Sequence, residues 1–210
     1  MQNIKPTATL MVLSAALFLS ACASVASLVY PLNENAAKAR AGSYKLDPDH
    51  ASVLFAVSHF GFSTFRGRFD TLSGSLNFDS ENPEKSNVTI EIQTDSLHTG
   101  VGKLDALLLA DDMFSSGGSP VIQFTSTEIN QTSEKTGQIK GIVTVKGISK
   151  PVTLEARFIG SGTNPLTRDR TVGFSATTTI QRSAFGLKNW LPFVGDTVDI
   201  TVDVEFVEKR

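Results

Sequence analysis

Few residues of this chain have the types and the spacing that metal binding or catalysis requires. The three histidines are His50, His59 and His98, and they form neither a His-x-His nor a His-x-x-x-His pair. The single cysteine, Cys22, lies near the N-terminus, so a disulfide framework cannot form within one chain. These residues therefore give no metal-binding or thiol-based motif.

The acidic pairs do not favour catalysis either. Asp47 and Asp49 flank a proline, as in a turn before a strand, whereas Asp111 and Asp112 lie near the end of an expected helix. Metal binding or catalysis by either pair is the less favoured alternative. Ser175 follows Gly-Phe, but residues 173–177 lack the second glycine of a nucleophile elbow and fall in an expected strand. We therefore expect no catalytic residue, no metal ligand and no catalytic cofactor.

The N-terminus has the features of a secretion signal. Residues 1–21 carry one charge, Lys5, and an apolar run at 10–19 that is roughly half the length of a membrane-spanning helix. The sequence LSAC at 19–22 resembles a bacterial lipobox, in which the cysteine becomes the lipidated N-terminus. Ordinary signal cleavage after Ala23 is the alternative. The position of Cys22 favours the lipoprotein.

We expect three parts along the chain, namely a lipoprotein signal peptide (1–21), a lipidated tether (22–43) and one domain (44–210). Acyl chains on Cys22 would anchor the protein to a membrane. The small and polar residues 23–43 are typical of a linker. Ala23 rather than aspartate follows the cysteine. By resemblance to sorted lipoproteins, this implies anchoring at the periplasmic side of the outer membrane. A soluble periplasmic protein is the alternative.

The composition is that of a single domain with a large amount of phenylalanine. A chain of 210 residues with 40% hydrophobic residues can bury a substantial core. Its formal charge of -2 gives no basic field for nucleic acid, so we expect no nucleic-acid partner. The chain has 14 Phe but only 1 Trp and 2 Tyr, which favours either a large core or an apolar cavity.

From residue 44 onward, apolar and polar residues alternate in short runs that turn residues interrupt. In the clearest run, Val198, Ile200, Val202, Val204 and Phe206 share one face. About eight such runs predict an all-β fold with one dry face, either a sandwich or a closed barrel. Residues 103–114 instead have helical spacing and predict a helix of about three turns between strands.

The aromatic residues allow two interpretations. Five phenylalanines lie between residues 55 and 69, and they could fill a core at a hairpin or line the mouth of a lipid cavity. Trp190, in a loop before the last strand, could pack under that loop or gate an apolar ligand. His59 shares the dry face of its strand, where a hydrogen-bonded core histidine is the commoner case. Arg182, at a strand end, could pair with a carboxylate.

Several separate blocks of the sequence resemble one known family. The blocks are YKLDPDHASVLF at 44–55, VSHFGFSTFRGRF at 57–69, Gly74, GISKPVTL at 147–154 and GFSATTTIQRSAFG at 173–186. In their order and spacing they resemble the YceI-like polyisoprenoid-binding family, over about residues 43–209. The chain departs from the family's usual pattern at residues 107–114. The resemblance implies an eight-stranded antiparallel lipocalin-like barrel with a short helix between strands.

The resemblance also implies an interior that holds a long isoprenoid chain. An apolar chain in a dry tunnel gains ~25 cal/mol per Å² of buried surface and needs few specific polar contacts. We expect the headgroup at a mouth formed by His59 or Arg182. The expected contacts with the isoprenoid are Val53, Phe55, Val57, His59, Phe60, Phe65, Phe69, Leu76, Ile90, Leu108, Phe114, Phe124, Leu154, Phe174, Ile180, Phe185, Trp190, Ile200 and Val202.

The favoured hypothesis is a non-catalytic envelope protein that sequesters or transports an isoprenoid lipid, either a polyprenyl chain or an isoprenoid quinone. The expected partners are this lipid and, through Cys22, a membrane, and a homodimer is left open. One alternative is a solid-cored interaction barrel whose Phe-rich hairpin meets a partner. Another is an enzyme acting on isoprenoids, which would need two acidic side chains to converge inside the barrel.

Overall fold

The structure, a computed structural model, describes residues 32–110, 112–114 and 121–209. Within these residues, no helix has the length and apolar character needed to cross a bilayer. The strands are β1 (Gly42–His59), β2 (Ser63–Phe69), β3 (Leu72–Phe78), β4 (Asn87–Gln93), β5 (Leu97–His98), β6 (Val121–Gln131), β7 (Thr136–Val145), β8 (Ile148–Thr163), β9 (Arg170–Gln181) and β10 (Val194–Glu208). The helices are α2 (Gly102–Leu108) and the short 3-10 turns η1 (Ala36–Lys38), η2 (Pro83–Lys85), η3 (Thr94–Ser96) and η4 (Arg182–Phe185).

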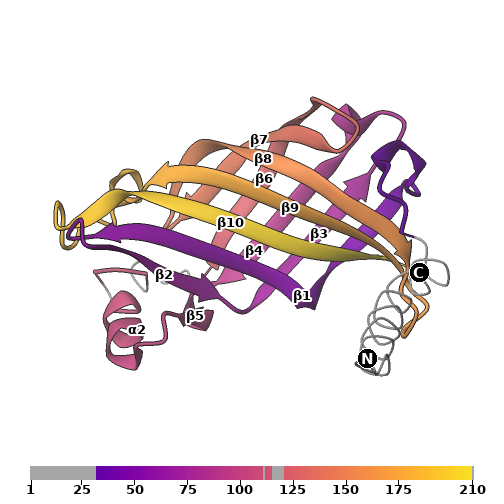
Figure 1. The fold of residues 1–210 in the computed structure, drawn as a ribbon. Coiled ribbons are helices and arrows are strands. Elements are labelled where there is room, and N and C mark those ends of the chain that lie inside the picture. The colour runs from indigo at the N-terminus through magenta and orange to yellow at the C-terminus, as the bar shows by residue number, and fades with distance from the viewer. Residues whose placement is uncertain (1–31, 111, 115–120, 210) are drawn as a thin grey trace, which may run out of the picture.

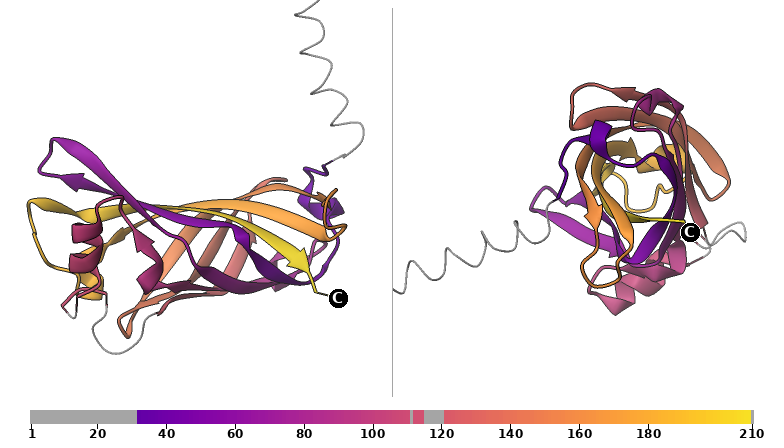
Figure 2. Two further views of the ribbon diagram at one scale, coloured as in Figure 1. Left: turned by 90° about the horizontal axis from the view of Figure 1, so that it is seen from below. Right: turned by 90° about the vertical axis from the view of Figure 1, so that its right-hand side faces the viewer.

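Eight of the described strands close into an antiparallel barrel, which confirms the predicted fold class. Their order is β10-β9-β8-β7-β6-β4-β3-β1, and β1 pairs again with β10. Figures 1 and 2 show this elongated barrel from the side and along its axis. The structure thus selects the closed barrel over the sandwich, because the first and last strands join and leave neither as a free edge along that seam.

Strand β1 bends at a large bulge and changes neighbours there. Opposite β10, Leu46 pairs with Phe206 and Ala51 with Val204, so residues 47–50 face a single residue of β10. Before the bulge β1 pairs with β3, and after it β1 pairs with β2. Bulges of this kind turn a strand away from its sheet. The hairpin of β1 and β2 therefore extends the wall beyond β3, toward the end where α2 lies (Figure 1).

The helix predicted over residues 103–114 is too long, because α2 ends at Leu108. The chain then turns, and the amide of Phe114 donates to the carbonyl of Leu108 at 2.9 Å. Met113 is buried in this turn. Asp111, one half of the acidic pair at 111–112, lies outside the described residues.

Part of the predicted tether packs on the barrel. Asn33 forms an isolated bridge with Ser161 of β8, and Ala39 is buried in the main core. The structure thus places residues from 33 onward against the domain. Cys22 and the signal peptide lie outside the described residues, so the predictions about them stay predictions.

The molecule has two apolar clusters, one along the barrel and one at its α2 end. The larger cluster lies along the barrel and includes Tyr44, Leu72 and Val172, whose exposed fractions are at most 2%. The smaller cluster consists of Met113, Val145, Phe185 and Leu187 and lies at the end where α2 and η4 meet the barrel. The chain therefore closes this second end with its own side chains.

Candidate binding cavity

The barrel encloses an apolar cavity of about 140 Å³ at the end covered by η1. Ala36 of η1 and Pro83 of η2 form part of its rim, and Gln131 and residues 134–137 of the β6–β7 turn form another part. The walls are mainly aliphatic and aromatic, namely Leu76, Phe78, Val88, Ile90, Phe124, Ile129, Ile139, Leu154, Ala156, Phe158, Phe174, Ala176, Val202, Val204 and Phe206. This hollow can hold hydrocarbon without leaving a polar group unpaired.

Four phenylalanine rings form one wall of the cavity. The ring centroid of Phe174 lies 5.4 Å from that of Phe158, 6.0 Å from Phe78 and 6.3 Å from Phe206, with the rings close to edge-on. Edge-to-face contacts at these distances add stability beyond the burial of area. Phe174 is only partly buried, although it points inward, because it borders the hollow.

The cavity exists because small residues face each other where larger ones would meet. Ala156 of β8 pairs with Ala176 of β9, and both side chains line the hollow. Neighbouring Leu154 and Val202 are partly buried for the same reason as Phe174. The interior of the barrel is thus not completely filled by side chains, but the space left open is small. At about 140 Å³ it is smaller than the roughly 300–1,000 Å³ of sites that enclose drug-sized ligands.

A second hollow, a groove of about 850 Å³, opens in the barrel wall between β8 and β9. The β8–β9 ladder ends at the pair Glu155–Thr177. Beyond it, residues 148–154 of β8 pair with β7, and residues 178–181 of β9 pair with β10. A side-chain hydrogen bond, from the hydroxyl of Thr178 to the carbonyl of Thr153 at 2.8 Å, joins the two strands where the ladder stops. The barrel is therefore split along one seam near η4.

The groove passes through the wall of the barrel, because residues from both faces of the sheet line it. Val152, Ile180 and Ile200 come from the inner face, where each packs on one of the two apolar clusters. Thr179 and Asp199 come from the outer face, and the hydroxyl of Thr179 donates to Asp199 at 2.9 Å. The groove is thus apolar toward the interior and polar toward solvent.

Arg182 holds the loop above this groove. Its Nε donates to the carbonyl of Gly195, Nη1 to Leu187 and Nη2 to Val194, at 2.6–2.9 Å. The side chain is 8% exposed, and burial lowers the pKa of the guanidinium below its usual range. All three nitrogens of the guanidinium are thus engaged by the loop. The predicted contact of Arg182 with a headgroup gains no support from this geometry.

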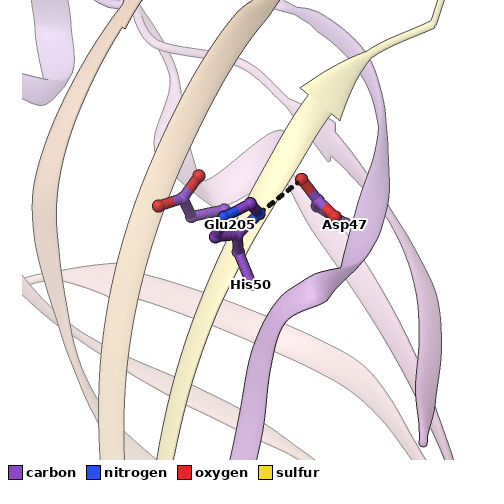
Figure 3. Close-up of side chains that lie close together, drawn as sticks. All are labelled: Asp47, His50 and Glu205. Carbon is purple, nitrogen blue, oxygen red and sulfur yellow. Dashed lines mark hydrogen bonds and ion pairs between the residues drawn. The ribbon is translucent and has the colours of Figure 1, made fainter. Parts of the chain in front are cut away.

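A polar cluster lies on the outer face of the barrel at the bulge of β1. Figure 3 shows His50 between Asp47 and Glu205, with Nδ1 of His50 2.9 Å from Oδ2 of Asp47. Their potential ligand atoms lie within 4.8 Å of one another. The hydrogen bond and charge of Asp47, and then the charge of Glu205, raise the pKa of His50. Because protonated His50 can neutralise these carboxylates, we infer that the cluster stabilises the bulge.

Comparisons with known proteins show what this barrel is similar to. The YceI-like domain matches residues 44–206, which is most of the chain. UPF0312 proteins of Pseudomonas putida and Pseudomonas syringae are 34% identical over 178 residues, which cover 84% of this chain and 92% of theirs.

The chain belongs to the YceI-like family. Solved structures agree on the fold of this YceI-like barrel. Burkholderia cenocepacia BcnA matches with a TM-score of 0.69 at 21% identity, over 76% of this chain and 98% of BcnA. A Campylobacter jejuni YceI protein matches with a TM-score of 0.64 at 25% identity, over 73% and 90%. A polyisoprenoid-binding domain from Saccharophagus degradans, implicated in plant cell wall breakdown, matches with a TM-score of 0.59 at 14% identity, over 81% and 100%.

The YceI-like barrel brings many of the predicted ligand contacts to the two hollows. Those that line the cavity are Leu76, Ile90, Phe124, Leu154, Phe174 and Val202. Those that line the groove are Ile180, Phe185 and Ile200. Those that pack in the apolar clusters without lining either hollow are Val53, Phe55, Phe69, Leu108 and Phe114. Val57 is also buried.

Four predicted contacts of the YceI-like domain lie away from both hollows. His59 is exposed rather than buried on the dry face, and its ring contacts those of Phe60 and Phe65. Phe60, 50% exposed, stacks on Phe193 at 5.4 Å, and Trp190 is 42% exposed. Inward and outward side chains alternate along β1 as expected, but the strand extends beyond the end of the core. Its last residues therefore form an exposed aromatic tip instead of a buried face.

The cavity of this YceI-like barrel also has lining residues that were not predicted as contacts. The most important are Phe78, Phe158 and Phe206, which complete the ring of aromatic side chains around Phe174. A signal for them existed, because each lies on the apolar face of its alternating strand. Alternation gives the side of the sheet that a residue faces but not its depth along the barrel.

Proposed function

We propose that this protein binds an isoprenoid lipid, a polyprenyl chain or an isoprenoid quinone, inside its barrel. In this role it catalyses no reaction and sequesters or transports the lipid in the bacterial envelope. The observation that carries the proposal is the apolar cavity, which small residues leave open in an otherwise well-packed barrel. The likeness in fold to a polyisoprenoid-binding domain supports the choice of ligand.

The proposed location follows from the N-terminal sequence. A lipid anchor on Cys22 would hold the protein at the outer membrane, within reach of membrane isoprenoids. Labelling of growing cells with a radioactive fatty acid tests this part. Label that is retained on the wild type and lost with Cys22→Ser supports lipidation, whereas an unlabelled wild type contradicts it.

Lipid extraction tests the binding itself. We expect mass spectrometry of the protein, purified without added lipid, to detect a prenyl species that solvent extraction removes. The variant Ala156→Leu fills the cavity and should lower the amount of co-purified lipid by about tenfold. It should keep or raise stability, by about 0.5–2 kcal/mol, as cavity filling commonly does.

Thr125→Leu is the matched control, because it adds the same side chain on the exposed face of β6. This control should leave the lipid content unchanged. If both variants retain the lipid of the wild type, the cavity is not the binding site. If the wild type itself carries no prenyl lipid and takes none up, the proposed function is wrong.

The exposed aromatic tip favours a second function, that of an interaction barrel without a cavity ligand. Phe62 is 90% exposed and Phe193 61%, next to Phe60 and Trp190 at the same end of the barrel. Large exposed apolar patches commonly mark interaction sites. The variant Phe62→Asp separates the two functions, because loss of a protein complex with unchanged lipid content would favour the interaction barrel.

A further inference from the structure

The cavity is too small to hold a long isoprenoid alone, and the groove continues it. The cavity volume of about 140 Å³ is below that of sites that enclose drug-sized ligands. On each of three strands, the next inward position after a cavity residue lines the groove. These neighbouring positions are Leu154 and Val152 on β8, Ala176 and Thr178 on β9, and Val202 and Ile200 on β10. Two residues along a strand span only about 7 Å.

A tail that enters the cavity can therefore leave the barrel sideways between β8 and β9. Figure 1 shows these two strands as neighbours, and their ladder stops at Glu155 and Thr177. The end of the barrel past α2 and η4 is filled by the apolar cluster around Phe185. The part of the lipid nearest its headgroup would then lie among the outer residues of the groove.

The charges of the groove disfavour an anionic headgroup. Among the residues that line it, Lys150 is the cation, and Glu155 and Asp199 are carboxylates. Proteins usually recognise phosphate with clusters of Arg or Lys, whereas this groove sets one Lys beside two carboxylates. The buried cation above the groove, Arg182, already donates to three backbone carbonyls. At the opposite end of the cavity, Lys135 forms an ion pair with Glu34.

The remaining polar groups suit an uncharged oxygen-bearing headgroup. The outer lining carries the hydroxyls of Thr153, Thr177 and Thr201. It also carries the hydroxyl of Thr179, which donates to Asp199, and the amide of Gln181, which donates one hydrogen bond to Thr197. Hydroxyl and amide groups can donate to a carbonyl oxygen, and hydroxyl and carboxylate oxygens can accept from an alcohol. From this arrangement we infer that the lipid has an uncharged headgroup, an alcohol or a quinone, and that this headgroup lies in the groove between β8 and β9. The inference rests on the proposed function.

A competition experiment with lipids of one chain length tests the headgroup class. The full-length protein, stripped of lipid in detergent, is offered a polyprenol, a quinone with the same tail, or the corresponding polyprenyl diphosphate. Native mass spectrometry then measures occupancy. We expect the diphosphate to bind at least about tenfold more weakly than the two uncharged lipids, since the groove offers more negative than positive charge.

Charge reversal tests the position of the headgroup. Asp199→Lys should improve diphosphate binding by about tenfold, because it turns the groove cationic. Asp203→Lys is the control, because Asp203 is exposed on the same face of β10 but about 13 Å further along the strand. It should leave diphosphate binding unchanged, and thermal melting should show that both variants are folded.

The outcomes separate this inference from the proposed function. If the wild type binds the diphosphate as tightly as the polyprenol, the inference is overturned while isoprenoid binding stands. If Asp199→Lys and Asp203→Lys improve diphosphate binding equally, the headgroup does not lie in the groove, and the inference is again overturned. If none of the three lipids binds, the proposed function fails and the inference with it.

Discussion

Arg182 shows how a buried charge can serve structure. A guanidinium that is taken out of water needs partners for its donors, and here three carbonyls of residues 187–195 supply them. Next to it, the amide and hydroxyl of Ser183 donate to Asp196 and lower the pKa of that carboxyl. The loop between η4 and β10 is therefore fixed by polar contacts at its base, which keeps Phe185 and Leu187 in the smaller core.

Removal of this guanidinium should loosen the loop. We expect Arg182→Met to lower the free energy of unfolding by about 1–3 kcal/mol, because it leaves carbonyl acceptors without their donors. Urea unfolding measures the change. Arg68→Met is the control, since Arg68 is exposed in a surface ion pair with Asp70, and it should change stability by less than about 1 kcal/mol. Equal effects of the two variants would contradict the structural role of Arg182.

His50 should make stability depend on pH in a defined direction. Asp47 and Glu205 raise the pKa of its imidazole in the folded protein, so folding favours the protonated ring. This contribution is complete below the ordinary pKa of about 6.5 and disappears as pH rises through the higher folded pKa. The difference in melting temperature between wild type and His50→Gln should therefore be largest in mild acid and shrink toward alkaline pH.

A double-mutant cycle checks the origin of this effect. In the background of Asp47→Asn, which removes the hydrogen-bonded carboxylate, the pH dependence due to His50 should be much weaker. If the melting temperatures of wild type and His50→Gln run parallel at all pH values, protonation of His50 contributes nothing to stability.

At the scale of single strands, close approach of neighbours decides which residues fit. A Cβ at Gly141 of β7 would lie 2.4 Å from Cε2 of Phe124 and 2.5 Å from the carbonyl oxygen of Thr125. Phe124 borders the cavity, so a methyl group at Gly141 would push its ring inward. Glycine at this position therefore lets a large aromatic residue of β6 pack across β7.

Gly141→Ala should destabilise the barrel by about 1–3 kcal/mol through this overpacking. Denaturant unfolding provides the measurement. Gly102 in α2 is the matched control, because a Cβ there has no neighbour within 4 Å. Gly102→Ala should be neutral or stabilise by about 0.4–1 kcal/mol through the unfolded chain. A Gly141→Ala protein as stable as the wild type would show that β6 and β7 adapt more freely than the structure implies.

The first half of β8 behaves as a locally exposed edge. Residues 148–154 pair with β7 on one side but form no ladder pairs with β9 on the other. This segment contains Lys150 and Pro151. Proline donates no amide hydrogen bond and lysine resists the approach of another strand, so both protect a free edge from pairing with a second chain. The seam can therefore stay open without causing aggregation.

For the molecule as a whole, the β1–β10 seam is paired along its length, whereas the β8–β9 seam is split. The β1–β10 seam pairs eleven residues on each strand, whereas β8 and β9 separate beyond Glu155 and Thr177. Local opening requires the loss of few contacts where the ladder has already ended. The split β8–β9 seam is thus a part of the wall that can open for a ligand.

Native-state hydrogen exchange should reveal this difference. We expect amides of residues 148–154 and 178–181 that face the split to exchange faster than those of the β1–β10 seam, because they lack ladder partners. Loading with a polyprenol should slow exchange at the split and leave the β1–β10 seam unchanged. Equal protection of both seams in the lipid-free protein would contradict a lateral opening.

The amino-acid sequence alone determined the all-β fold class of this protein, because alternation at period two specifies which side of a strand is apolar. It placed Val202, Val204 and Phe206 on one inner face and, with the quoted sequence blocks, indicated the YceI-like family. It also identified six of the residues that line the cavity. These are local properties of the chain, and they do not depend on residues that are distant in the sequence.

Only the tertiary structure decided where along the barrel each inward residue lies. Depth depends on register between strands that are far apart in sequence, so alternation could not tell buried Val53 from exposed His59 on the same face of β1. For the same reason, the sequence could not show that Arg182 donates to backbone carbonyls or that the β8–β9 ladder ends at Glu155. The cavity, the groove and the aromatic tip all depend on these long-range pairings. The groove and the tip form where one strand extends beyond the pairing with its neighbour, and the cavity forms where small residues meet across strands.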